Sequence, residues 1–185
     1  EVAHDSASSS NLMLADYVKK IPVTVETLWL DVKNAEEKIL GPMMAALERE
    51  IEPARFNRVM FESSLRSDAL AKTTERGFYT SYYLPTDELL ALLASGNASQ
   101  MEHAADGLAT QLGAQKVGAI SFDRRLYGFV KDYVEPKLER ELDYHVWSEK
   151  RLSRWYFLPR LSLRDYFEDT RVKTILFELK GARRS

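Results

Sequence analysis

Two side chains of opposite charge stand two positions apart in the apolar segment LWLDVK (28–33): Asp31 and Lys33. Because successive side chains of a β-strand point to opposite faces, we expect both on one face, near the carboxyl end of a strand. Burying a carboxylate and an ammonium group costs free energy unless each has a partner. A metal cation and an anionic substrate would supply both partners. An internal salt bridge is the structural alternative.

Polar residues also stand at the ends of four other predicted strands. They are His4 and Asp5, Glu62 and Ser64, Ser121 and Asp123, and Trp147 and Ser148. The active site of a (β/α)8 barrel is built from the carboxyl ends of many strands. This distribution therefore favours a barrel over an open sheet.

The elements that would position these residues alternate between strand and helix. Strands are predicted at 28–32, 58–62, 78–84, 117–122, 143–147 and 172–179, with 1–4 as the end of an earlier strand. Helical patterns lie between them at 36–51, 65–75, 86–93, 101–112 and 127–139. Such alternation predicts βαβ units and a parallel sheet. Neither GxGxxG nor GxxxxGK[ST] follows a strand, which argues against a nucleotide-binding open sheet. We therefore expect an α/β fold: a single TIM-type (β/α)8 barrel over 1–185, N-terminally incomplete, with seven parallel strands.

The composition of the chain argues against several classes of function. The 185 residues are 45% hydrophobic and 29% charged, with a formal charge of −2 and no cysteine. Thiolate chemistry and disulfides are thereby excluded. The absence of a basic stripe argues against nucleic acid as a partner. No run approaches the roughly 20 apolar residues of a membrane-spanning helix.

Four segments, in order, resemble the barrel family of glycerophosphodiester phosphodiesterases and phosphatidylinositol phospholipase C. The segment WLDVKN (29–34) is similar to the strand in which an acidic residue precedes a lysine by two. The segments VAHD (2–5), YHVWS (144–148) and DTRVKTILF (169–177) resemble the second-histidine strand, a late Trp strand and the closing strand. The resemblance implies metal-dependent hydrolysis of a phosphodiester, with a small glycerophosphodiester or a phospholipid headgroup as the substrate.

The resemblance also implies a role for individual residues. His4 would be one of two acid–base histidines. Asp31 would bind Mg²⁺ or Ca²⁺, and Lys33 would stabilise charge on the phosphoryl oxygens. Trp147 would pack against the alcohol moiety of the substrate. The family's first histidine and its Glu-x-Asp ligand pair have no counterpart before His4, so the chain is either a fragment or a member without catalytic activity.

For several other residues the sequence allows both a functional and a structural interpretation. Glu62 is a candidate substrate-binding residue or a structural carboxylate, and His145 shares a face with Trp147 or is a structural histidine. His103 is expected on the surface. Tyrosines in 78–83 fit either a choline pocket or barrel packing, and the basic, aromatic segment 151–157 fits membrane-surface contact or a packed loop. Asn97-Ala98-Ser99 matches the N-glycosylation sequon, a short pattern that often occurs by chance.

Two further hypotheses belong to other functional classes. One is a catalytically inactive barrel that binds a phosphorylated ligand or a protein partner. The other is an unrelated barrel enzyme acting on a neutral substrate, with Asp31 and Lys33 as its acid–base pair. An extracytoplasmic or secreted location is slightly favoured.

Overall fold

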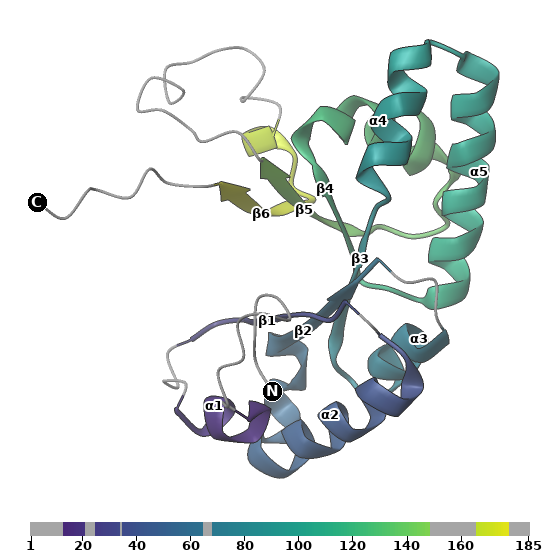
Figure 1. Cartoon of the computed structure of the whole chain (residues 1–185). Helices are drawn as coiled ribbons and strands as arrows, with labels where there is room; N and C mark the ends of the chain where they lie inside the picture. The colour runs from purple at the N-terminus through teal and green to yellow at the C-terminus, as the bar shows by residue number, and fades with distance from the viewer. Residues whose placement is uncertain (1–12, 21–24, 34, 65–67, 149–165, 178–185) are drawn as a thin grey trace, which may run out of the picture. The chain divides into compact units, whose positions relative to one another are not determined.

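The structure is a computed structural model of the whole chain, and it describes residues 13–20, 25–33, 35–64, 68–148 and 166–177 (Figure 1). The chain divides into two compact units. The first comprises 1–81 with 115–117, and the second comprises 82–114 with 118–185. His4, the predicted strand at 1–4 and the segment 151–157 lie outside the described residues.

The predicted α/β class is confirmed. Six parallel strands follow one another in the sheet in chain order: β1 (Leu28–Asp31), β2 (Val59–Ser63), β3 (Tyr79–Tyr83), β4 (Ala119–Asp123), β5 (Asp143–Ser148) and β6 (Val172–Phe177). Each matches a predicted strand. Within the described ranges there are six strands rather than the expected seven, and they do not form a closed barrel, because β1 and β6 stand at the two ends of the strand order.

The first unit also contains four helical elements: α1 (Leu14–Lys20), α2 (Glu37–Glu50), the 3-10 helix η1 (Pro53–Arg58) and α3 (Asp68–Glu75). The α2 helix buries Leu40, Met44 and Leu47. The apolar positions Ile39 and Met43 also follow a helical period, but they are only half-buried. The helical pattern predicted at 36–51 is therefore confirmed by α2.

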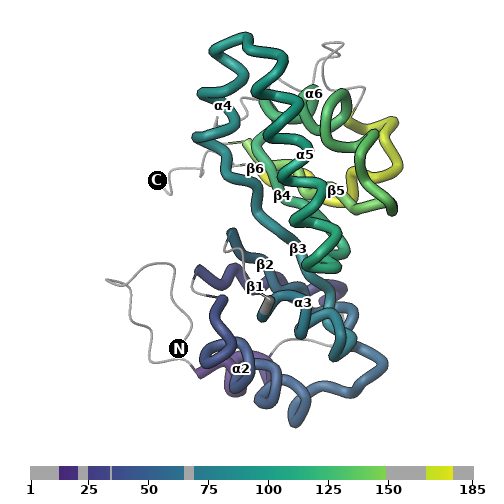
Figure 2. Tube along the Cα trace, turned by 90° about the vertical axis from the view of Figure 1, so that its right-hand side faces the viewer, coloured from purple at the N-terminus to yellow at the C-terminus, as the bar shows by residue number. Residues whose placement is uncertain are grey.

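The second unit contains α4 (Thr86–Ser95), α5 (Ala98–Gln115) and a mixed helical segment at 124–137. That segment comprises η2 (Arg124–Leu126), α6 (Tyr127–Phe129), the π-helix η3 (Val130–Val134) and η4 (Glu135–Lys137). The α5 helix extends three residues beyond the predicted pattern at 101–112 at each end, so Gly113 lies inside it. The tube in Figure 2 shows α4 and α5 running side by side, joined by a tight turn.

A polar network ties β5 to the mixed helical segment and to the turn before β6. The Tyr144 hydroxyl donates to Glu135 Oε2 at 2.7 Å and accepts from Arg171 at 3.2 Å. Lys131 pairs with Glu135 at 2.6 Å and with Asp169 at 3.1 Å. Burial and the neighbouring Glu135 carboxylate raise the pKa of Tyr144 well above its usual value. The hydroxyl therefore stays protonated and can act as the donor.

Candidate functional site

The carboxyl end of β1 brings Asp31 and Lys33 together. Lys33 Nζ lies 2.6 Å from Asp31 Oδ2, so the two side chains form an ion pair. Asp31 is the last residue of β1 and Lys33 lies in the turn that follows, so the strand face expected for both residues does not extend to Lys33. The pair is open to solvent, with 77% of the Lys33 side chain and 49% of the Asp31 side chain exposed. Since β1 is the first strand in the sheet order, it has one neighbouring strand, β2, among the residues that the structure describes. The pair therefore avoids the desolvation cost expected of buried charges.

Glu62 lies beside Asp31, because the two residues are partners in the parallel register of β1 and β2. Its surroundings are different: the residue is only 5% exposed. Oε2 accepts a hydrogen bond from Trp29 Nε1 at 2.9 Å, and Oε1 accepts one from Ser81 Oγ at 3.1 Å. Glu62 thus holds an aromatic residue of β1 and a hydroxyl of β3 beside the exposed ion pair.

The sequence analysis missed Trp29 and Ser81. A signal for Trp29 was present, since it precedes Asp31 by two and must share its face of β1. Ser81 offered no comparable signal, because its partner is 19 residues away in the chain.

Trp147, the predicted substrate-packing residue, belongs to the second unit. Its ring stacks on that of Tyr83, with centroids 5.5 Å apart and an interplanar angle of 14°. Its Nε1 is buried and has no hydrogen-bond partner among the described residues. Tyr83 is therefore the tyrosine of the aromatic stretch that meets Trp147, while Phe78 and Tyr82 are core residues.

Asp123 and Trp147 are register partners on β4 and β5, and Ser121 and His145 are partners two pairs earlier. The Asp123 carboxylate accepts from the backbone N–H of Arg125 at 2.8 Å and from its guanidinium group at 2.8 and 2.9 Å. Burial disfavours the charge, but these bonds and the cation outweigh it and hold the pKa of Asp123 below its usual value. Asp123 is thus an ionised partner of Arg125.

His145 shares its strand face with Trp147 and is 4% exposed. Burial lowers the pKa of His145 to about 4, an effect that the nearby Asp143 charge offsets in part. The imidazole is therefore neutral at neutral pH. His103 is exposed on α5, as expected.

The residues predicted for the site fall into three groups. Asp31, Lys33 and Glu62 lie together in the first unit. Trp147 lies in the second unit, beside Tyr83. His4 lies outside the described residues.

The part of the chain that the structure describes contains no group of three His, Asp or Glu side chains placed to hold a metal ion. Of the two carboxylates at this end of β1 and β2, Asp31 is the exposed one and lies beside a cationic group, whereas both Glu62 oxygens accept hydrogen bonds. Mg²⁺ commonly binds through one or two carboxylates together with water and substrate phosphate, whereas Ca²⁺ takes roughly six to eight oxygen ligands.

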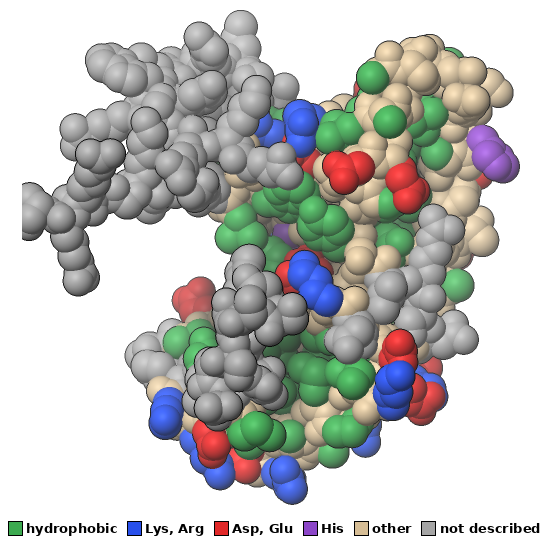
Figure 3. Space-filling view, in the orientation of Figure 1, with side chains coloured by type: hydrophobic (Ala, Val, Ile, Leu, Met, Phe, Trp, Pro, Cys, Tyr) green, Lys and Arg blue, Asp and Glu red, His purple; other side chains and the backbone are tan. Residues whose placement is uncertain are grey.

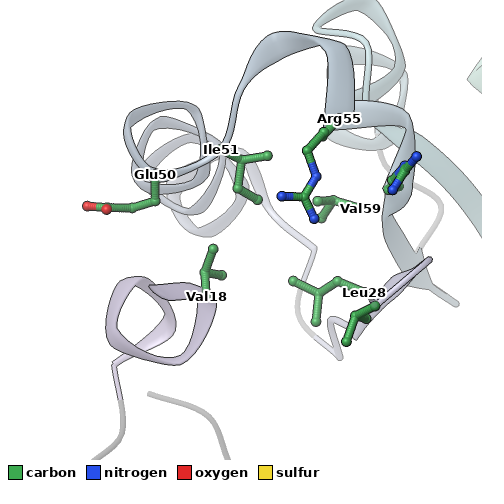
Figure 4. Close-up of a pocket in the computed structure, with 8 residues that line it drawn as sticks. Val18, Leu28, Glu50, Ile51, Arg55 and Val59 are labelled. Atoms are coloured by element: carbon green, nitrogen blue, oxygen red, sulfur yellow. The ribbon is translucent and has the colours of Figure 1, made fainter. Parts of the chain in front are cut away.

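A separate pocket in the first unit lies at the opposite end of β1 and β2 (Figure 4). Leu28 and Val59, the first residues of the two strands, line it together with Val18, Ile51 and Arg55. Asp31 is the last residue of β1, so this pocket and the ion pair are distinct features.

Acidic and basic side chains are interspersed on the face of the molecule shown in Figure 3. None of the helices described here is long and apolar enough to cross a membrane.

Comparison with protein-family models and with curated proteins finds no match for this chain.

Proposed function

We propose that the chain is a phosphodiesterase of the barrel type, which hydrolyses a glycerophosphodiester or a phospholipid with the help of a divalent cation. The observation that carries the proposal is the exposed Asp31–Lys33 ion pair at the carboxyl end of β1. A carboxylate beside an ammonium group offers one contact to a cation and one to a phosphate oxygen. The sequence resemblance names the same two residues.

Lys33 is the electrostatic group of the proposed reaction. Its ammonium group is 77% exposed and can turn from Asp31 toward a substrate phosphate without being drawn out of a buried site. Charge accumulates on the phosphoryl oxygens in the transition state, and a cationic donor at that position lowers the barrier.

Asp31 is the residue that would hold the cation, Mg²⁺ or Ca²⁺. When bound, the cation would neutralise phosphate charge and polarise the phosphoryl group. Glu62 keeps Trp29 in place next to Asp31 through the 2.9 Å indole hydrogen bond. We therefore assign Glu62 to the wall of the site. It would not touch the substrate itself but would position Trp29, which would.

The remaining two residues complete the proposal. Trp147, which stacks on Tyr83 in the second unit, is proposed to pack against the alcohol moiety on the basis of the resemblance alone. His4 is proposed as an acid–base group on the basis of the resemblance alone.

The first experiment measures hydrolysis of glycerophosphocholine, lysophospholipid and phosphatidylinositol, with and without EDTA. Activity that EDTA abolishes and Mg²⁺ restores supports the proposal. Hydrolysis that survives EDTA would contradict the proposed role of a divalent cation. Measurable binding of a phosphodiester without turnover would identify a non-catalytic binding protein.

The second experiment tests the ion pair with a matched control. Lys38 and Glu36 form another exposed ion pair of the same length, 2.6 Å, in the same unit. Lys33→Ala should abolish most turnover, whereas Lys38→Ala should leave it unchanged. Equal effects in the two variants would remove the basis of the proposal.

A further inference from the structure

The turn between α4 and α5 carries a feature that phosphodiester chemistry does not use, the tripeptide Asn97-Ala98-Ser99. Asparagine followed by any residue except proline and then by serine or threonine is the acceptor sequence for N-linked glycans. The chain has three other asparagines, Asn11, Asn34 and Asn57, and none of them has a hydroxyl residue two positions later. The sequence thus contains a single acceptor tripeptide.

The tripeptide lies at an accessible position. Every residue from 94 to 100 is exposed. Gly96 adopts a left-handed conformation (φ +64°) that ends α4 and turns the chain back into α5. Figures 1 and 2 both show this turn at the outer tip of the helix pair.

The side chains around Asn97 leave room for a large substituent. The segment 94–99 reads Ala-Ser-Gly-Asn-Ala-Ser, so every neighbour is small. Because these residues are exposed, a substituent on Asn97 can extend into solvent without displacing part of the core.

The hydrogen bonding of Asn97 is compatible with modification. Asn97 Oδ1 accepts from the backbone N–H of Gln100 at 3.1 Å, which caps the first turn of α5. No described residue accepts a hydrogen bond from Asn97 Nδ2. The atom that would carry the glycan is therefore free, and the atom that caps the helix keeps its carbonyl character afterwards.

We infer that Asn97 is an N-glycosylation site, used when the chain passes through a eukaryotic secretory pathway. In the reaction Asn97 Nδ2 attacks the anomeric carbon of an oligosaccharide carried on a polyprenyl diphosphate. The new C–N bond replaces the C–O bond to the diphosphate, Nδ2 loses one proton, and the polyprenyl diphosphate leaves. The inference is independent of the proposed enzymatic function.

The test is secretion of the full chain from eukaryotic cells behind a heterologous signal peptide. Treatment with peptide N-glycosidase F should raise the electrophoretic mobility of the secreted protein. If the enzyme is used in ¹⁸O water, mass spectrometry should find one labelled aspartate, at position 97. A secreted, folded protein that carries no glycan would overturn the inference.

Three variants test the acceptor sequence without removing the cap of α5. Ser99→Ala removes the required hydroxyl and leaves the cap intact, and Asn97→Asp removes the acceptor nitrogen and keeps a capping oxygen. Both should be secreted without glycan. Ser99→Thr should retain it. A glycan that persists in Ser99→Ala would show that the modification lies elsewhere.

Discussion

Asp31 and Glu62 are partners in the register of β1 and β2, yet one carboxylate is half-exposed and the other is buried. Asp31 forms an exposed ion pair with Lys33, and Glu62 accepts hydrogen bonds from Trp29 and Ser81. Two adjacent carboxylates thus differ in what they can do. Asp31 is open to a ligand, whereas both carboxylate oxygens of Glu62 already accept hydrogen bonds from other side chains.

Asp31→Asn and Lys33→Ala should leave stability nearly unchanged. Exposed ion pairs contribute about 0–1 kcal/mol, so the free energy of unfolding, measured by urea denaturation, should fall by less than ~1 kcal/mol. Turnover should nevertheless drop at least ~100-fold, since removal of a single electrostatic donor commonly costs that much. A parallel loss of stability and activity would instead indicate a structural role for the pair.

Replacement of Glu62 should act mainly on stability. Glu62→Ala leaves the Trp29 indole and the Ser81 hydroxyl without their acceptor, which should cost about 1–3 kcal/mol. Glu62→Gln keeps one carbonyl oxygen for the indole and should cost less. Urea denaturation followed by tryptophan fluorescence distinguishes the two. The assignment is wrong if both variants unfold at the wild-type urea concentration.

Stability should decline between neutral pH and pH 5 because of His145. The unfolded side chain titrates near ~6.5, whereas burial lowers the pKa of the folded one to about 4. Between these values the unfolded state binds more protons, so acid favours unfolding. The urea midpoint should therefore be lower at pH 5 than at pH 7.5.

The control for this pH effect is a pair of histidine variants. His145→Asn should flatten the dependence, and His103→Gln, at an exposed position of α5, should not. An NMR titration that places the folded His145 pKa near its ordinary value would contradict the prediction.

Tyr144→Phe should weaken the network between β5 and the turn before β6. The hydroxyl is bonded to both Glu135 and Arg171, so its loss should cost about 1–2 kcal/mol. Tyr133→Phe, on the π-helix η3, is the matched control, since the Tyr133 ring stacks on Phe129. Similar unfolding free energies for both variants would show that the network contributes little.

Asn97→Ala should destabilise the unglycosylated protein by about 1 kcal/mol, because the first turn of α5 loses its cap. Asn97→Asp should have little effect, since aspartate caps equally well. Thermal unfolding of protein made in bacteria measures both changes without interference from a glycan. Equal unfolding temperatures for wild type and Asn97→Ala would contradict the role of Asn97 as a cap.

The sequence by itself determined the order and type of most elements. Helix and strand periods are local properties, so all six described strands were predicted close to their observed bounds. The closeness of Asp31 and Lys33 was predictable from their separation of two residues, although Lys33 lies in the turn after β1 and not in the strand.

Only the tertiary structure decided the surroundings of those residues. The hydrogen bonds of Glu62 join residues 33 and 19 positions apart, and nothing in a local pattern specifies such partners. The same holds for the Tyr83–Trp147 stack and for the link from Tyr127 to Asp169, which lie 42 residues apart. Burial is likewise a property of the packed chain, which is why the exposure of Asp31 and the enclosure of Glu62 could be assigned only after the strands were paired.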